Sequence, residues 1–202
     1  MRNNIINING QIISMPTQTH KINQESFYIF KIKTKRLSET YDILHVLISD
    51  RTLYFNLLKK NQFININGEI RSYNSSDLNL YANQTKLILV IFAHKIIFSE
   101  QNNFNQVFLE GLICKNPIYR KTPFGREITD ILLITKRFNN KFDHIPCIVW
   151  GKNARLALKL NIKSKIKIYG RMQSRQYQKK LITGEVLDKT TYEVSVSSIN
   201  FS

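Results

Sequence analysis

Apolar and polar residues alternate along many short segments of this chain, a period of two that is typical of half-buried β-strands. The most regular segment is 165–177, in which Ile166, Ile168 and Met172 alternate with charged and aromatic residues. Gly, Pro, Asn and Ser separate the alternating segments and predict turns. The pattern predicts strands over residues 5–14, 27–36, 43–49, 63–73, 86–98, 107–114, 128–137, 145–150, 165–177 and 191–201.

Two segments break the alternation and favour short helices. One helix is expected over residues 154–160, with an apolar face formed by Ala154, Ala157, Leu158 and Leu160. A second helix is expected over residues 52–60, with Asp50 as a possible N-cap. A polar loop is expected over residues 178–189, between the last two strands.

The chain contains an internal repeat, because residues 3–98 and 105–201 can be laid over each other at an offset of about one hundred. The equivalent positions include Gly10 and Gly111, Lys35-Arg36 and Lys136-Arg137, and Tyr41-Asp42 and Phe142-Asp143. After a one-residue slip, residues 64–72 fall on residues 166–174. A repeat of this length is a whole small domain.

Each half has the order strand, strand, strand, helix, strand, strand, which is the layout of the OB-fold, a partly open Greek-key barrel. We therefore expect an all-β protein with one short helix per repeat, built from two tandem five-stranded OB-fold barrels. The first domain, which has diverged, is expected over residues 1–98, and the second over residues 106–202. A polar linker at 99–105 joins them.

Charge distinguishes the two halves. The net charge is +16, of which residues 1–100 contribute +5 and residues 101–202 contribute +11. A protein this basic usually meets a polyanion, either nucleic acid or an anionic membrane surface. The alternative is a solubilising charge with no partner, but the concentration of the excess in one half favours a binding surface.

The remaining composition indicates a reducing, cytoplasmic setting. No run of 18 apolar residues would span a membrane, and the first residues lack the apolar core of a signal peptide. Cys114 and Cys147 have no Cys or His at zinc-finger spacing. We expect both to be small buried strand residues, with a disulfide as the alternative.

Nothing in the sequence indicates an enzyme. The chain has 14 acidic residues, and no pair of them stands at metal-binding spacing. His20, His45, His94 and His144 are scattered, and no glycine-rich phosphate loop or nucleophile elbow occurs. We therefore expect no catalytic residue, metal or cofactor.

Four motifs follow one another in the second half. They are Gly111 in the first strand, a Pro…Arg…Thr-x-x-Gly turn ending at Gly125, Ile-Pro-x-x-x-Trp-Gly-Lys-x-Ala at 145–154, and Gly-Arg-x-Gln-x-Arg-x-Tyr at 170–177. In this order they make the second half resemble the bacterial single-stranded DNA-binding protein family. The resemblance implies an OB-fold that binds single strands in DNA replication, repair or recombination. The first half keeps the spacing but has lost several of the motifs.

Single-strand binding without sequence preference needs a basic track for the phosphates and aromatic faces for the bases. Alternate residues of segment 165–177 supply both on its outer face, and no acidic residue in this segment balances them. The outward set is Lys165, Lys167, Tyr169, Arg171, Gln173, Arg175 and Tyr177, and the inward set is Ile166, Ile168, Gly170, Met172 and Ser174. The alternative is an ordinary solvated strand face.

Trp150 is the single tryptophan of the chain and matches a position that is typically a stacking aromatic in the resembled family. The alternative is a core tryptophan that packs on the helix at 154–160. Loop residues complete the predicted interface. They are Phe138 with Lys136 and Arg137, Phe124 and Arg126 near Arg120 and Lys121, and Lys179 near Lys180. The alternative for Phe138 is a ring that caps the end of the barrel, and the alternative for the others is an ordinary solvated loop.

The first half presents a weaker version of this surface. Ser49 occupies the place of Trp150, and Glu69 occupies the place of Arg171. Its remaining binding candidates are Lys35, Arg36, Arg71 and Tyr73. We expect the first half to bind DNA more weakly or to serve the assembly.

The leading hypothesis is sequence-independent single-stranded DNA binding, carried mostly by the second half. The alternatives are a primosome or recombination accessory protein that uses the first half for protein contacts, and an RNA-binding OB-fold protein. A homodimer would give the four OB-folds that such proteins commonly assemble. The family usually ends in an acidic tail, whereas this sequence ends at Ser202, so we do not expect recruitment of partner proteins through such a tail.

Overall fold

The computed structural model describes residues 3–36, 38–52, 54–74, 78 and 87–201, and its contacts divide the chain into two compact units. The N-terminal unit consists of Asn7–Phe104 and Gln173–Tyr192. The C-terminal unit consists of Met1–Ile6, Asn105–Met172 and Glu193–Ser202.

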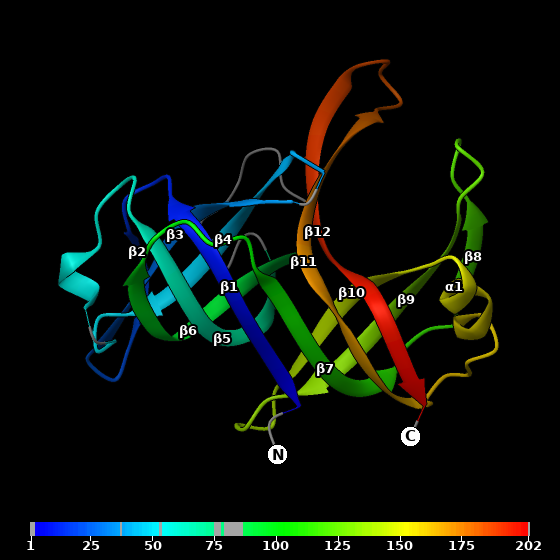
Figure 1. The fold of residues 1–202 in the computed structure, drawn as a ribbon, viewed down its shortest axis with the longest axis horizontal. Helices are drawn as coiled ribbons and strands as arrows, with labels where there is room; N and C mark the ends of the chain where they lie inside the picture. The colour runs from blue at the N-terminus through cyan, green and yellow to red at the C-terminus, as the bar shows by residue number, and fades with distance from the viewer. Residues whose placement is uncertain (1–2, 37, 53, 75–77, 79–86, 202) are drawn as a thin grey trace. The chain divides into compact units, whose positions relative to one another are not determined.

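The strands of the N-terminal unit form a closed ring (Figure 1). They are β1 (Asn4–Ile12), β2 (Thr17–Ile22), β3 (Glu25–Lys35), β4 (Tyr41–Ser49), β5 (Phe63–Asn74) and β6 (Leu87–Ser99). Their order is β2-β3-β4-β6-β5-β1, and a pairing between β1 and β3 closes the ring. The strand β2 lies outside the ring, on the free edge of β3.

The C-terminal unit repeats this arrangement. Its strands are β7 (Asn105–Ile113), β8 (Ile118–Lys121), β9 (Glu127–Lys136), β10 (Phe142–Trp150), β11 (Lys165–Lys180) and β12 (Val186–Phe201). Their order is β7-β11-β12-β10-β9-β8, and a pairing between β7 and β9 closes the ring. In both units one pair is parallel, β4 with β6 and β10 with β12. The prediction of two tandem OB-folds is confirmed.

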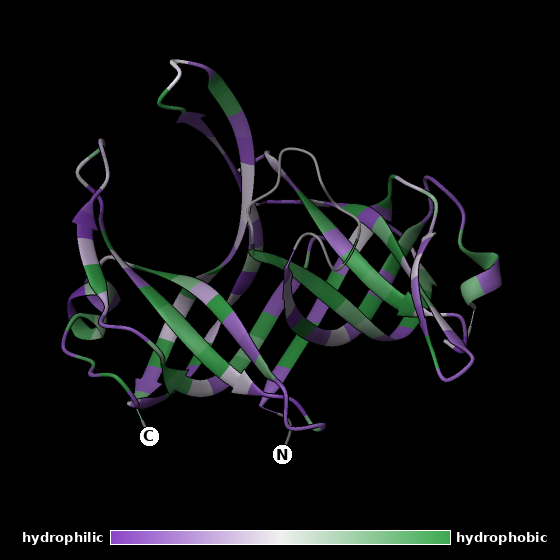
Figure 2. Ribbon diagram, turned by 180° about the vertical axis from the view of Figure 1, so that it is seen from behind, coloured by the Kyte–Doolittle hydropathy of each residue, from purple (hydrophilic) through white to green (hydrophobic). Residues whose placement is uncertain are grey.

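Apolar and polar residues alternate along the strands, and the apolar ones form the core of each unit. Figure 2 shows apolar and polar bands following one another along the ribbons. In β5 the side chains of Ile64, Ile66 and Ile70 are buried, and in β11 the side chains of Ile166, Ile168 and Met172 take the same places. These rows are the inward faces that the sequence predicted.

The glycine inside each row is required by a close approach of two strands. A Cβ atom added to Gly68 would lie 2.2 Å from the carbonyl oxygen of Phe92, and one added to Gly170 would lie 2.3 Å from that of Ser195. Real Cβ atoms essentially never come so close, so only glycine fits. The same constraint therefore fixes the same residue type in both repeats.

The helices differ from the prediction. The helix α1 spans Lys152–Ala157 and buries Ala154 and Ala157. Leu158, which the sequence placed on the apolar face, is 47% exposed. The six-residue helix ends before this position, so Leu158 is not held against the core.

The helix predicted over residues 52–60 is replaced, among the described residues, by a 3-10 turn, η1, at Phe55–Leu57. Asp50 is not its N-cap, because the Oδ2 atom of Asp50 accepts a hydrogen bond from the backbone N–H of Ser26 instead. No residue of η1 is buried, so packing does not extend the turn into an α-helix.

Two strands were missed and two were predicted too short. β2 and β8 are short, and no residue in either is fully buried, so they lack the alternation that reveals a strand. The expected loop at 178–189 is mostly strand, because β11 continues to Lys180 and β12 starts at Val186. These two strands form a long hairpin (Figure 1).

Both cysteines are free thiols. Cys147 is buried in β10, as expected, and burial together with the charge of Glu193 raises the pKa of its thiol. Cys114 directly follows β7 and is partly exposed, so the expectation that it is buried is wrong. Within the described ranges, no helix is long and apolar enough to cross a bilayer.

Candidate nucleic-acid interface

Trp150 is held at the rim of the C-terminal unit by one hydrogen bond. It is the last residue of β10, and its indole Nε1–H donates to the hydroxyl oxygen of Ser195 on β12 at 3.0 Å. The parallel register pairs Ile148 with Ser195, which brings the indole over the neighbouring strand. The side chain is partly exposed, so part of the ring is accessible to a base.

The strand β12 lies between β10, which carries Trp150, and β11, and the hydroxyl of Ser197 on β12 donates to the carbonyl of Tyr169 on β11 at 3.0 Å. The phenol ring of Tyr169 is 45% exposed and contacts the ring of Phe108 on β7, with 5.1 Å between the ring centroids. Lys167 and Arg171 flank Tyr169 and are partly exposed. Aromatic and basic side chains therefore do share one face of β11, as predicted.

The charge of this face is lower than the sequence suggested. The Nζ atom of Lys165 forms an ion pair with Glu110 of β7 at 2.7 Å. The hydrogen bond from Lys165 and the charge of Lys167 hold the pKa of the Glu110 carboxyl below its usual range, although its partial burial opposes this. The expectation that the cations are unbalanced is thus wrong at Lys165, where the counter-charge comes from the adjacent strand.

The alternation of β11 breaks after Met172. Gln173, predicted to point outward, is 6% exposed, and Ser174, predicted to point inward, is partly exposed. The Asn105 carboxamide donates to the carbonyl of Met172 at 2.7 Å and accepts from its N–H at 3.0 Å. Asn105 is the first residue of β7, so the pairing of β7 with β11 ends here on side-chain hydrogen bonds.

Arg137 does not present a free cation. Its Nε atom donates to Oδ2 of Asp143 at 2.7 Å, and a second bond from its guanidinium reaches Oδ1. Asp143 is fully buried and the Arg137 side chain is 11% exposed. This pair spans the turn between β9 and β10, which gives Arg137 a structural role.

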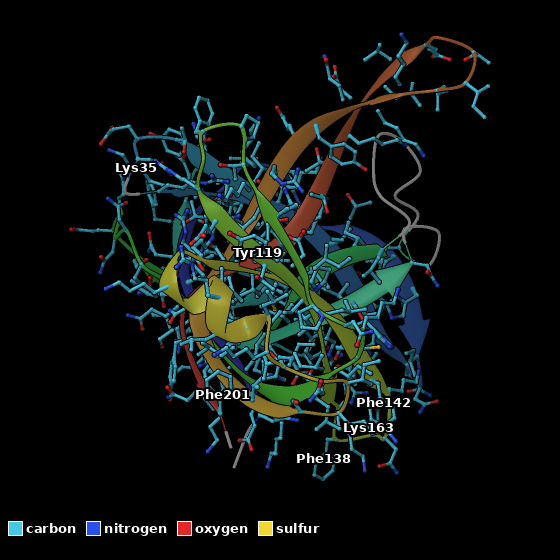
Figure 3. All side chains as sticks on the ribbon, turned by 90° about the vertical axis from the view of Figure 1, so that its right-hand side faces the viewer. Lys35, Tyr119, Phe138, Phe142, Lys163 and Phe201 are labelled. Carbon is cyan, nitrogen blue, oxygen red and sulfur yellow. The ribbon has the colours of Figure 1, made fainter. Side chains whose placement is uncertain are left out.

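The two loop aromatics predicted to bind DNA, Phe124 and Phe138, are the most exposed aromatic side chains among the described residues of the C-terminal unit. Phe138 projects from the β9–β10 turn (Figure 3) and is wholly exposed beside the exposed Lys136. Phe124 is 91% exposed between β8 and β9, and it precedes Gly125, whose positive φ of 74° makes the turn. Arg126 is exposed, whereas Arg120 is engaged by Asp130 at 2.7 Å.

Comparison with known proteins matches this part of the chain. The model of the family described as "Single-strand binding protein family" matches residues 104–202. The Single-stranded DNA-binding protein B of Bacillus subtilis is 34% identical over 82 residues, which cover 37% of this chain and 73% of that protein. The chain belongs to the single-strand binding protein family.

One further relative agrees with this assignment, and one solved structure agrees with the fold. A Single-stranded DNA-binding protein of Clostridium tetani is 39% identical over 83 residues, and the match covers 38% of this chain and 57% of that protein. The wild-type single-stranded DNA-binding protein of Thermus aquaticus has a TM-score of 0.71 at 17% identity, with 98% of this chain and 92% of that one covered. At this identity the second likeness bears on the fold alone.

Three predicted site residues lie on the hairpin and belong to the N-terminal unit: Arg175 and Tyr177, from the family motif, and Lys179, which was expected on a loop. The guanidinium carbon of Arg175 lies 5.8 Å from the ring centroid of Tyr177, which is partly exposed. Lys179 is exposed near the hairpin tip. The predicted interface residues are therefore divided between the two units.

The base of this hairpin is anchored on β4. The backbone N–H of Ser174 donates to Oδ1 of Asp42 at 2.7 Å, and the carbonyl of Ser174 accepts from Arg36 at 2.6 Å. Arg36 also donates to Oδ2 of Asp42 at 2.8 Å. Arg36, a weak candidate for DNA contact, is therefore engaged in holding the hairpin.

The other first-half candidates also have partners. Lys35 pairs with the exposed Glu39 at 2.9 Å, and Arg71 pairs with Glu69 at 2.6 Å. Tyr73 is partly exposed near the end of β5.

A group of aromatic side chains on the N-terminal unit was missed. The rings of His20 and Phe27 stack with centroids 4.8 Å apart, and Phe27 contacts Phe92 at 6.2 Å. All three side chains are partly exposed. They lie on three different strands, so no spacing within the sequence indicates their contact.

Proposed function

We propose that this protein binds single-stranded DNA without sequence preference, in DNA replication, repair or recombination. The observation that carries the proposal is the partly exposed Trp150, which bonds to Ser195 of β12, the strand next to the aromatic and basic face of β11. A fixed aromatic ring offers a stacking face to any base, and neighbouring cations follow the phosphates. The family assignment supports the same function and a DNA-binding protein rather than an enzyme.

The proposed contacts divide into stacking rings and cations. We assign stacking to Trp150 and Tyr169, with the exposed Phe124 and Phe138 as loop contacts and Tyr177 on the hairpin. We assign phosphate contacts to Lys167, Arg171, Lys136, Arg126, Arg175 and Lys179. Lys165 and Arg137 are weaker candidates for phosphate contacts, because they already form ion pairs with Glu110 and Asp143.

The test is titration of the whole protein with oligothymidylate, followed by the fluorescence of Trp150 and, independently, by the anisotropy of a labelled oligonucleotide. Stacking on one aromatic is worth about 1–3 kcal/mol per base, so Trp150→Ala should weaken binding roughly 5- to 150-fold. Tyr177→Ala should act in the same direction. The matched control is Phe201→Ala, which removes a 53% exposed ring outside the proposed interface. Wild-type affinity in both Trp150→Ala and Tyr177→Ala would contradict the assignment.

Salt and competitor nucleic acids define the mode of binding. The logarithm of affinity should fall with the logarithm of salt concentration with a slope of roughly −0.7 per phosphate neutralised. Affinity that is flat in salt would exclude a phosphate track. Stronger binding of a matched RNA oligomer would favour the RNA-binding alternative, and capture of a replication or recombination protein after nuclease treatment would favour the accessory role.

We also infer that two chains associate, which would bring together four OB-folds, and that the protein acts in the cytoplasm on the nucleoid. Sedimentation equilibrium should give about twice the monomer mass of 23.7 kDa. A monomer at micromolar concentration would contradict the dimer.

A further inference from the structure

Equivalent strands of the two units can be matched residue by residue from their glycines and their registers. Gly68 packs against the carbonyl of Phe92, and Gly170 packs against that of Ser195. The parallel registers agree, since Leu47 pairs with Phe92 and Ile148 pairs with Ser195. Phe92 therefore occupies the place of Ser195.

The same registers show a reciprocal exchange. Ser49 lies two residues beyond Leu47 on β4, as Trp150 lies two residues beyond Ile148 on β10. The C-terminal unit thus combines Trp150 with Ser195, and the N-terminal unit combines Ser49 with Phe92. The first half has not lost its aromatic residue at this place but carries it on the adjacent strand.

Other side chains extend Phe92 into a row. Phe27 of β3 pairs with Ser49 in register and contacts the Phe92 ring, and His20 of β2 stacks on Phe27 with an angle of 11° between the ring planes. At the other end, the guanidinium carbon of Arg71 lies 3.3 Å from the centroid of Phe92. We call His20, Phe27, Phe92 and Arg71 the aromatic row.

Arg71 is held rigidly at the end of this row. Its Nε atom donates to Oε1 of Glu69 at 2.6 Å, and His94 lies 3.5 Å from Oε2 of the same carboxylate. Burial alone would raise the pKa of Glu69, but the hydrogen bond to His94 and the charge of Arg71 lower it to about 2. Glu69 therefore stays ionised and fixes the guanidinium plane, and the Arg71 side chain remains 21% exposed.

We propose that the aromatic row is a second single-strand-binding surface, in which bases stack on the guanidinium plane of Arg71 and on the partly exposed rings of the row. The proposal rests on the proposed function. Single-stranded nucleic acids stack on aromatic rings and on arginine planes in the same way, without a sequence requirement. Glu69, which makes a phosphate track unfavourable, acts here as the support for a stacking cation.

The test replaces the two phenylalanines by the residues of the other repeat, which the same fold accommodates. The whole chain is made with Phe92→Ser and Phe27→Ile, since Ile128 is the cross-strand partner of Trp150. The control is Tyr54→Ser, which removes a 43% exposed ring elsewhere on the same unit. Binding is measured with oligothymidylates of about 12 and about 28 nucleotides, lengths that suit one and two OB-folds.

The double variant should bind the long oligonucleotide about tenfold more weakly than wild type and occlude roughly half as many nucleotides per chain. It should bind the short one as wild type does, through the Trp150 surface. Wild-type affinity and occluded length in a folded double variant would overturn the proposal. Failure of the wild-type protein to bind either length would instead refute the proposed function.

A second measurement uses the wild-type protein and does not depend on how the variants fold. Oligothymidylate containing 5-iododeoxyuridine is cross-linked by light, and the modified peptides are identified by mass spectrometry. Cross-links at His20, Phe27 or Phe92 support the aromatic row. Cross-links confined to residues 104–202 would overturn it.

Discussion

The guanidinium of Arg137 donates two hydrogen bonds to the buried carboxylate of Asp143, and Arg36 donates two to Asp42 in the same way in the other unit. Asp143 and Asp42 are 0% and 1% exposed. The Lys-Arg and aromatic-Asp dipeptides of the repeat are therefore explained by a buried ion pair that each barrel needs. Within each Lys-Arg dipeptide, the arginine is engaged in this pair, and only the lysine could contact DNA at the surface.

Arg137→Ala should destabilise the C-terminal unit by about 3–5 kcal/mol, because it leaves the Asp143 charge buried without its partner. Urea unfolding followed by Trp150 fluorescence reports on this unit, since Trp150 is the single tryptophan. The control is Lys136→Ala, an exposed neighbour that should change stability by no more than about 0.5 kcal/mol and should weaken DNA binding. Equal stability of the two variants would contradict the structural role of Arg137.

The alternating segments were predictable because their period reflects burial of one face. Ile166, Ile168 and Met172 were placed correctly in the core. The break at Gln173 was not predictable, since it falls where β11 passes from the C-terminal unit to the N-terminal unit, which the local alternation does not reveal.

The chemistry of the site was predictable by residue type but not by pairing. The sequence identified Trp150 and the basic face of β11, yet it missed Glu110, which neutralises Lys165 from an adjacent strand. It treated Ser49 as the loss of an aromatic residue. The register that places Phe92 at the position of Ser195 is a property of the sheet. An alignment at one offset hides it, because the offset between the repeats grows from 101 at Leu47 and Ile148 to 103 at Phe92 and Ser195.

Gly170→Ala should destabilise the protein by about 3 kcal/mol or more, because the new Cβ atom would lie 2.3 Å from the carbonyl oxygen of Ser195 and overpack two paired strands. Gly184→Ala is the matched control. No atom lies within 4 Å of its added Cβ, and the cost is only the positive φ of 87°, about 1–2 kcal/mol. Comparison of the urea midpoints checks the difference, and a larger effect at Gly184 would contradict the close approach of β11 and β12.

His45 should make stability depend on pH between about 6.5 and 4. It is 1% exposed, neither ring nitrogen has a hydrogen-bond partner, and burial together with the charge of Lys31 lowers its pKa to about 4. In this window the unfolded chain binds a proton that the folded protein does not. Stability is therefore unaffected above pH 6.5 and falls as the pH decreases, by about 3 kcal/mol at pH 4.

Urea unfolding across this range should show a shallower pH dependence in His45→Phe than in the wild-type protein. The titration of Glu69 does not overlap with that of His45 between about pH 6.5 and 4.5. The pKa of Glu69 is lowered to about 2, so its contribution is present above its unfolded value of 4.5 and is lost mainly below that value. Identical slopes for the two proteins between about pH 6.5 and 4.5 would show that His45 does not titrate as the structure requires.

Ser195→Ala tests whether the fixed position of Trp150 matters for binding. The substitution removes the acceptor of the indole N–H and leaves every ring and cation of the C-terminal unit in place. The freed indole must then be ordered by the DNA, which costs about 0.5–1.5 kcal/mol for one immobilised side chain. Affinity for oligothymidylate should fall about 2- to 10-fold, less than in Trp150→Ala, and time-resolved anisotropy should show a more mobile indole.

The control is Ser197→Ala, whose hydroxyl bonds the carbonyl of Tyr169 on the same strand pair. Equal affinity in Ser195→Ala and wild type, with a mobile indole, would show that pre-ordering of Trp150 contributes nothing to binding.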